Sequence, residues 1–311
     1  MSAMPPALRR ALARLLEIVP VLLAVMTITF VMARVMPGGP FDGERQLSPE
    51  AKAKNNAYYG LDKPLYKQYA IYVGNFLRGD LGPVYRHPDW TVNELLAQRA
   101  PVSAELGIWA SLVAIVVGLV AGVVASARPR SMTDYGTMGV AMVAICLPSF
   151  VLGPILLLAF GLKMQWVNVM GWNTAGDRVL PAVVLGLYYA AYIARLTRGS
   201  MLETRTQDFV RTARAKGCPP WRVQFVHTLR NALGPVLAYL APTIAGLVTG
   251  SFVVEQIFQI PGIGRLFVEA ALNGETPLLL GVTMLFSVIL LALNWAADVL
   301  ITLLNPKAAN E

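Results

Sequence analysis

Long apolar runs without a single charged residue alternate with polar segments along this chain. Each run holds 16 to 28 residues, and a helix needs about 20 residues to cross the hydrocarbon core of a bilayer. The two shortest can gain a turn at their ends, where arginine side chains reach the interface. The pattern predicts an all-α integral membrane protein with about six transmembrane helices. The runs cover residues 18–33, 106–127, 135–162, 179–194, 231–254 and 276–297.

Composition supports this membrane class. The chain is 56% hydrophobic and only 14% charged, and its mean hydropathy of +0.55 excludes an ordinary soluble domain. A net charge of +8 is also found in nucleic-acid-binding proteins. Here, however, most basic residues flank apolar runs, as they do when they set membrane orientation. We therefore expect the lipid bilayer, and no nucleic acid, as a partner.

The distribution of Lys and Arg predicts the orientation. Six spans place both termini on one side, and that side carries 14 basic residues against 3 on the other. The first loop, with 9, is too long for the positive-inside rule. We therefore expect cytoplasmic termini and a cytoplasmic loop at 195–230. No small-residue cleavage site follows Arg9, Arg10 and Arg14, so the first span stays uncleaved.

This topology divides the chain into four parts. An extracytoplasmic loop domain follows the first helix, and a core of five helices contains the cytoplasmic loop 195–235. The boundaries are 1–35 for the N-terminal segment with the first helix, 36–105 for the loop domain, 106–305 for the core and 306–311 for the cytoplasmic tail.

The first loop has its own helical pattern. Tyr66, Tyr69, Val73 and Phe76 recur at helical spacing with polar residues between them, which predicts an amphipathic helix. The glycine-rich residues 79–83 end it as a turn. Two interpretations stay open for this loop, a structural cap over the outer ends of the helices and a docking surface for another protein.

Small residues and prolines mark special points within the spans. Gly118 and Gly122 form a small-xxx-small pair, which lets helix backbones approach closely. Pro148 and Pro154 predict a kink or a discontinuity in the third span.

Aromatic and basic residues close the fourth run. Tyr188, Tyr189 and Tyr192 come just before Arg195 and Arg198. Tyrosines and arginines gather where a helix leaves the hydrocarbon core. We therefore expect an anchor at the inner membrane interface.

The segment 208–236 is the longest stretch dense in charge, with five basic residues between Arg211 and Arg230. Its first part, 208–216, reads as a short helix, and Gly217 stands where a left-handed residue would end it. Pro219 and Pro220 can begin the next helix without losing a needed N–H. The pattern predicts a helix, a tight turn and a second helix between two spans.

Two parts of this segment carry a family resemblance. Residues 211–217 read RTARAKG and residues 227–236 read HTLRNALGPV, which resembles the cytoplasmic loop of ABC-importer permeases in their peptide and dipeptide branch. Thr228 replaces an alanine, and only Ala213, Gly217 and Leu229 match the general E-A-A pattern. The resemblance implies a loop that couples the chain to ATPase subunits. Its candidate residues are Asp208, Arg211, Thr212, Ala213, Arg214, Ala215, Lys216, Gly217, His227 and Arg230.

Three other segments of the chain also resemble the peptide and dipeptide branch of these permeases. Residues 253–266 are similar to its VVE-x-I-F-x-x-P-G-x-G-R-L pattern, residues 59–82 to its first external loop, and residues 37–45 to its oligopeptide members. We expect Glu255, Gly262 and Gly264 to be candidates for the translocation path or a gate. Two interpretations of Glu255 stay open, because it either lines a wet cavity or reaches the interface.

The resemblance implies a type I ABC-importer permease fold and one half of the translocation path of an ATP-driven oligopeptide importer. Implied partners are a homologous second permease, two cytoplasmic ATPase subunits, an extracytoplasmic peptide-binding protein and the peptide substrate. The implied location is the bacterial cytoplasmic (inner) membrane. ATP and Mg would be bound by the ATPases, with no cofactor, metal or catalytic residue in this chain. Dipeptides, nickel chelates, glutathione and short glycans remain alternative cargoes.

Other classes fit less well. A secondary transporter needs charged residues at mid-depth, and the six runs have none. A channel or scaffold subunit does not need a helix–Gly–Pro–Pro–helix loop. The chain lacks the phosphate-loop, H-E-x-x-H, G-x-S-x-G and C-x-x-C motifs. Cys146 and Cys218 lack metal-site spacing and are not expected to form a disulfide, and His87 and His227 fall on opposite sides of the membrane.

Overall fold

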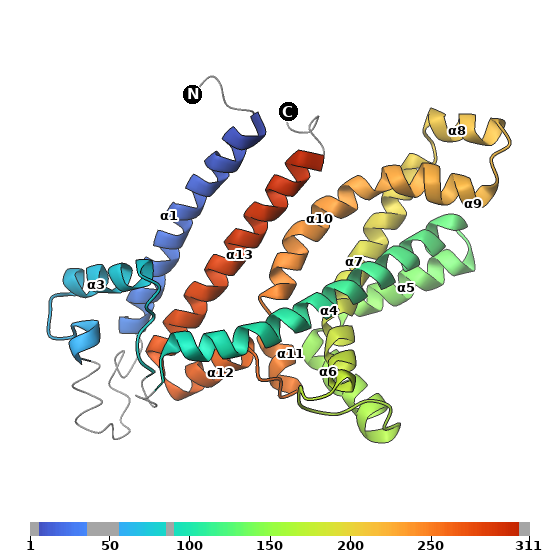
Figure 1. Cartoon of the computed structure of the whole chain (residues 1–311). Helices are drawn as coiled ribbons and strands as arrows, with labels where there is room; N and C mark the ends of the chain where they lie inside the picture. The colour runs from blue at the N-terminus through green and yellow to red at the C-terminus, as the bar shows by residue number, and fades with distance from the viewer. Residues whose placement is uncertain (1–5, 36–55, 85–89, 305–311) are drawn as a thin grey trace.

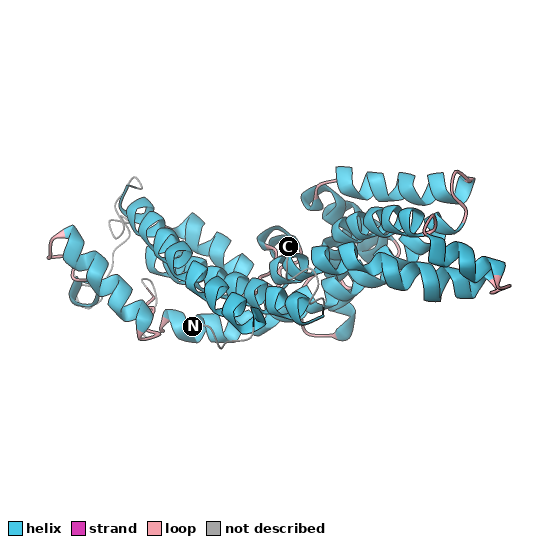
Figure 2. Ribbon diagram, turned by 90° about the horizontal axis from the view of Figure 1, so that it is seen from above, coloured by secondary structure: helices cyan, strands magenta, loops and turns pink. Residues whose placement is uncertain are grey.

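The computed structural model of the chain describes residues 6–35, 56–84 and 90–304. Helices make up nearly all of these residues (Figure 2), and an isolated antiparallel bridge joins Pro83 to Thr91. The elements are α1 (Pro6–Val35), α3 (Leu65–Leu77), α4 (Val92–Ala127), α5 (Met132–Cys146), α6 (Ser149–Leu156), the π-helix η1 (Leu157–Lys163), α7 (Ala175–Thr204), α8 (Asp208–Ala215), α9 (Pro220–Arg222), the π-helix η2 (Val223–Leu229), α10 (Arg230–Val248), α11 (Phe252–Ile257), α12 (Ile263–Asn273) and α13 (Thr276–Leu304).

Within the described residues, 5 helical segments are long and apolar enough to cross a membrane, and a sixth span results if α5 and the α6–η1 segment count as one. This confirms the all-α class with about six spans. The sixth is sharply bent, by 109°, where Leu147 and Pro148 separate α5 from α6. Proline has no N–H and disfavours helical geometry at the preceding residue, so the discontinuity predicted at Pro148 is confirmed.

The two ends of the molecule are formed by different elements. The N-terminus, the C-terminus and α8 lie at one end, and α3, α12 and α6 lie toward the other (Figure 1). Helices α1 and α13 run side by side in opposite directions and contact each other. Helix α4 crosses the molecule obliquely and packs along α7, which also contacts α5 and α10. The bundle of α4, α5, α7 and α10 therefore carries α8.

Small residues allow the close approach of α4 and α7. A Cβ atom added to Gly118 would lie 2.8 Å from the Ala190 carbonyl oxygen, and one added to Gly122 would lie 2.7 Å from that of Ala194. Such distances are far inside van der Waals contact, so only glycine fits. The packing predicted for this small-xxx-small pair is confirmed, and its partner is another span of the same chain.

Two helices extend beyond the apolar runs that predicted them. Helix α4 begins at Val92 instead of residue 106, because Thr91 and Glu94 form a capping box that starts the helix early. Helix α7 continues past residue 194 to Thr204. Charged residues mark the ends of the apolar runs in the sequence. They do not end α4 or α7, which continue through them. Tyr188, Tyr189 and Tyr192 therefore lie in the middle of α7, and Tyr192 stacks on Tyr239 of α10.

The fifth run departs from prediction at both ends. Residues 231–254 are not one helix, because α10 ends at Val248 and α11 begins at Phe252. Gly250 between them has φ +93°, a left-handed geometry that breaks the helix and favours glycine. At the other end, α9, η2 and α10 follow one another without a gap. The second helix of the charged loop is thus the beginning of the fifth span.

Helix α3 packs against α1, which confirms the amphipathic helix predicted in the first loop. Tyr69 shares a 2.8 Å hydrogen bond with Thr27, and the Arg34 guanidinium donates to Gln68 at 2.7 Å. Gly79 and Gly82 have positive φ, so the predicted turn is confirmed. Residues 37–45 and His87 lie outside the described residues.

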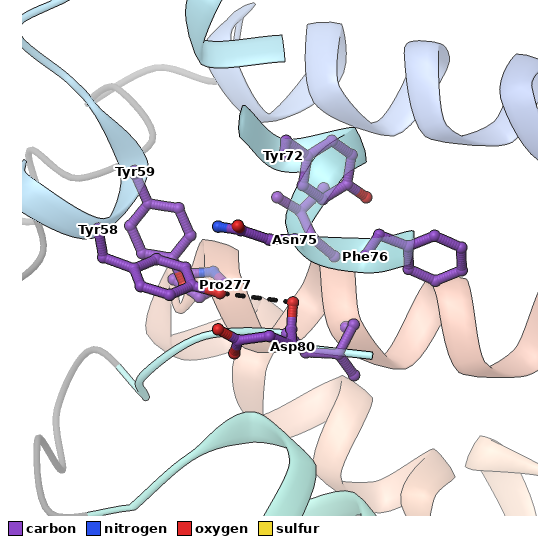
Figure 3. A pocket seen from close by; sticks show the side chains of 10 residues that line it. Tyr58, Tyr59, Tyr72, Asn75, Phe76, Asp80 and Pro277 are labelled. Carbon is purple, nitrogen blue, oxygen red and sulfur yellow. Dashed lines mark hydrogen bonds between the residues drawn. The ribbon is translucent and has the colours of Figure 1, made fainter. Parts of the chain in front are cut away.

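A tyrosine-rich contact joins this cap to α13. Tyr58 and Tyr59 lie opposite Asp80 and Pro277 (Figure 3). The Tyr58 hydroxyl donates to the Asp80 carbonyl oxygen at 3.4 Å, and the cavity between these side chains has a volume of only about 20 Å³. The described part of the first loop is therefore a closely packed cap over the ends of α1 and α13.

Candidate functional site

Helix α8 is a short amphipathic helix that stands at the edge of the bundle (Figure 1). Val210 and Ala213 are buried and face η2, which α8 contacts. The remaining predicted coupling residues of this helix and its turn are exposed. They are Asp208, Arg211, Thr212, Arg214, Ala215, Lys216 and Gly217. The helix thus presents charge outward while its apolar side fixes it to the protein.

The turn after α8 has the geometry predicted for it. Gly217 has φ +76°, its N–H donates to the Arg214 carbonyl at 2.9 Å, and the Cys218 N–H donates to the Ala213 carbonyl at 3.1 Å. This pair of bonds is a Schellman motif, which satisfies the last carbonyls of a helix. Pro220 then starts α9 at its first position. The turn fixes the direction of α8 relative to the fifth span.

The base of α8 is tied to the end of α4. The Arg205 guanidinium donates to the carbonyl oxygens of Ser126 and, at 3.3 Å, of Ala127. Gln224 of η2 donates to the Ser126 hydroxyl at 3.1 Å. Burial, followed by the nearby charge of Arg214, lowers the pKa of Arg205. These bonds join α4 to η2 and to the turn between α7 and α8, so the segments on both sides of α8 are bonded to the end of α4.

An ion pair braces the same end of the bundle. Asp134 of α5, with only 1% of its side chain exposed, accepts two hydrogen bonds from Arg198 of α7, at 2.6 and 2.7 Å. It also accepts the Arg130 N–H at 2.9 Å. Bidentate pairs of this kind hold orientation as well as distance. This pair was not predicted from the sequence, although Ser131 and Asp134 have the spacing of a helix N-terminus.

Two of the predicted coupling residues lie after α8 and its turn, in the fifth span. His227 is half-buried in η2 and Arg230 is exposed at the start of α10. Neither side chain makes a hydrogen bond within the described residues. The structure therefore gathers 208–217 into one unit and leaves His227 and Arg230 on the adjoining helix.

Exposed aromatic side chains accompany the basic residues of this region. Trp221 is 63% exposed, and Phe209 and Phe225 are exposed as well. Large apolar groups on a surface rimmed by charge are typical of a protein–protein contact. None of these three aromatic residues was among the candidates that the sequence indicated.

A second candidate site surrounds Glu255, whose side chain is fully buried. One carboxyl oxygen accepts the Ser103 hydroxyl at 2.9 Å and the other accepts the Arg265 N–H at 3.1 Å. The Ile263 N–H donates to the Ser103 oxygen at 2.8 Å. Glu255 thus joins α11 to α4 and to the beginning of α12. Among the described residues its side chain does not reach the surface.

Glycines close around this carboxyl group. A Cβ atom on Gly262 would lie 2.5 Å from the Ser103 hydroxyl, and one on Gly264 would lie 2.7 Å from the Phe252 Cα. A Cβ atom added to Gly250, which has a left-handed φ, would also lie too close to the Glu255 carboxyl group. The three predicted residues Glu255, Gly262 and Gly264 therefore form one packed junction. Their part in a path or gate stays a prediction.

Neither a cluster of metal ligands nor a disulfide is present among the described residues. In the part of the chain that the structure describes, no group of three or more His, Cys, Asp and Glu side chains could hold a metal ion. Cys146 and Cys218 are both free thiols.

Comparison with known proteins gives the family. Residues 114–310 match the family described as binding-protein-dependent transport system inner membrane component. The chain is 45% identical over 302 residues to the oligopeptide transport system permease protein OppB of Salmonella typhimurium, covering 96% of this chain and 99% of that protein. It is 40% identical over 286 residues to the dipeptide transport system permease protein DppB of Bacillus subtilis, covering 92% and 93%.

The fold has a solved counterpart. An inward-facing structure of the MetNI methionine ABC transporter covers 67% of this chain and 95% of its own, with a TM-score of 0.55 and 18% identity. This likeness shows the fold, which is that of a type I ABC-importer permease, as expected. With the apolar helices, the family places the chain in the inner membrane as a multi-pass protein. The chain therefore belongs to the family of binding-protein-dependent transport system inner membrane components.

Proposed function

We propose that this chain is the permease subunit of an ATP-driven oligopeptide importer and forms one half of its translocation path. The observation that carries this proposal is α8, a charged helix that ends in a fixed turn and whose flanking segments are bonded to the end of α4 through Arg205 and Gln224. Its relatives named as oligopeptide and dipeptide permeases support a peptide cargo. Uptake of labelled oligopeptides into vesicles, dependent on ATP and on this chain, tests the proposal.

In this function α8 is a lever. ATPase subunits that bind the exposed surface of Phe209, Trp221 and the basic residues would move α8 as their dimer closes. Because Arg205 before α8 and Gln224 after it are bonded to the end of α4, the movement would turn the spans together instead of bending a loop. ATP and Mg belong to the ATPases, and this chain contributes no catalytic group.

The remaining partners follow from the same assignment. A homologous second permease would complete the path, two ATPase subunits would bind at the end of the molecule that carries α8, and a peptide-binding protein would deliver cargo at the opposite end. Glu255, Gly262 and Gly264 would then hold the outer junction of α4, α11 and α12 as part of a gate. The cap formed by α3 lies at that same outer end (Figure 1).

The orientation is tested by labelling. In a variant without Cys146 and Cys218, a cysteine at exposed Gln207, between α7 and α8, should resist an impermeant thiol reagent in intact cells. A cysteine at exposed Arg78, at the end of α3, should react. Both should react after the membrane is opened. Labelling of the Gln207 variant but not the Arg78 variant in intact cells would invert the proposed topology.

Cargo choice should follow the binding protein. The apolar runs contain no charged residue that could select one peptide side chain, so we expect the permease to be permissive. Exchanging the binding protein for a docking-competent one with dipeptide specificity should change the imported peptides accordingly. A cargo profile that stays with the permease would contradict this, and the same assay would detect nickel chelates, glutathione or short glycans as cargo.

A further inference from the structure

A cavity with a volume of about 360 Å³ lies between the helices. It is separate from the small cavity beside Tyr58 and Tyr59. Its walls come from the junction of α5 and α6 at Pro148 and Ser149, from Tyr188 and Tyr189 in the middle of α7, and from the segment 246–253 at the end of α10. It is distinct from the coupling unit around α8 and is about the size of a small-ligand site.

Two helix breaks meet at this cavity. The chain bends by 109° between α5 and α6, and α10 gives way to α11 at Gly250. In a membrane, broken helices are tolerated where they are buried in protein or line a water-filled cavity. Gly250 and Ser251, as well as Pro148 and Ser149, line this one. The cavity thus gives a physical reason for both breaks.

The polar groups of the cavity are neutral, and the Ser251 hydroxyl already accepts the Val254 N–H at 3.3 Å. Within the described residues, the hydroxyls of Ser149 and Tyr189 make no hydrogen bond, and no charged residue lines the cavity. The remaining walls are apolar, including Leu152, Leu185 and Leu247. Such a lining suits a ligand that offers uncharged hydrogen-bonding groups together with varied side chains.

We propose that this cavity is a subsite for the peptide main chain during translocation. The inference rests on the proposed function, because it takes a peptide as the cargo. Peptide N–H and C=O groups would bind to the hydroxyls of Tyr189 and Ser149, while cargo side chains would lie against the apolar wall. Recognition of the main chain alone explains how one permease passes many sequences. A lipid acyl chain would use the wall but not the hydroxyls.

Gly246 allows the cavity to be filled without disturbing the fold. It lines the cavity, and a Cβ atom there would meet nothing within 4 Å. Gly246→Leu should therefore assemble normally and lower ATP-dependent peptide uptake at least ~10-fold, with a greater loss for bulkier peptides. Gly139→Leu is the matched control, because Gly139 is an exposed glycine of α5 with equally free space and lies outside the cavity. It should transport normally.

Two further measurements separate the outcomes. Tyr189→Phe keeps the ring and should lower uptake by roughly two- to tenfold, the effect of one neutral hydrogen bond. A photoreactive peptide should cross-link to segments 147–152, 184–189 and 246–253 during turnover. Equal uptake by the Gly246→Leu and Gly139→Leu variants, or labelling of these segments by a photoreactive phospholipid but not by the peptide, would overturn the subsite. Absence of peptide uptake by the unmodified complex would instead overturn the proposed function.

Discussion

Replacing Gly217 by valine is expected to uncouple ATP hydrolysis from transport while leaving the membrane-spanning helices assembled. Gly217 has φ +76°, and a residue with a Cβ atom in this region costs about 1–2 kcal/mol. A Cβ atom there would meet nothing within 4 Å, so the cost arises from the backbone conformation. Such a cost shifts the turn away from its native geometry by a factor of roughly 5–30.

The consequence should appear in coupling and not in assembly. Uptake by the Gly217→Val variant should fall about tenfold, with lost stimulation of the ATPase by loaded binding protein and retained co-purification of the second permease. Gly217→Asn is the matched control, because asparagine tolerates the left-handed region better than other side chains, and it should retain most of the activity. Normal uptake with normal ATPase stimulation in the valine variant would refute the role of α8 as a lever.

Replacing Glu255 by alanine is expected to loosen the junction of α4, α11 and α12 and to abolish most transport. The Arg265 N–H and the Ser103 hydroxyl would both lose their acceptor in a buried site. Each buried donor left unsatisfied costs about 1–3 kcal/mol. Hydrogen exchange at the Arg265 amide should therefore accelerate at least ~10-fold, since 1.4 kcal/mol is a factor of ten, and the solubilised complex should melt at a lower temperature.

Two companion variants sharpen this test. Glu255→Gln keeps the shape and one acceptor oxygen, so its loss should be smaller than that of alanine. Gly262→Ala retains the Glu255 side chain but would press a Cβ atom against its carboxyl group and place it 2.5 Å from the Ser103 hydroxyl, so it should loosen the same junction. Unchanged exchange at Arg265 and an unchanged melting temperature in the Glu255→Ala variant would show that the junction does not depend on this carboxyl group.

Features that depend on local chemistry could be predicted from the order of the residues alone. Long uncharged apolar runs require a bilayer whatever their neighbours are, so the membrane class and about six spans could be predicted. Pro148 cannot donate an N–H, and Gly217 favours a left-handed φ, so the bend in the third span and the turn after α8 could be predicted as well. The amphipathic helix α3 followed from its periodicity.

Helix boundaries and the pairing of distant polar groups, in contrast, depend on the assembled fold. Helix α4 starts at Val92 because of a cap, and α10 stops before Gly250, although the apolar run continues. Glu255 is hydrogen-bonded to Ser103, which lies 152 positions away in the sequence, and Arg198 pairs with Asp134, which lies 64 positions away. Partners so distant leave no periodic signal, since a buried polar group is stabilised by whatever group the fold brings to it. The cavity between two broken helices arises in the same way, from the packing of segments that no local pattern connects.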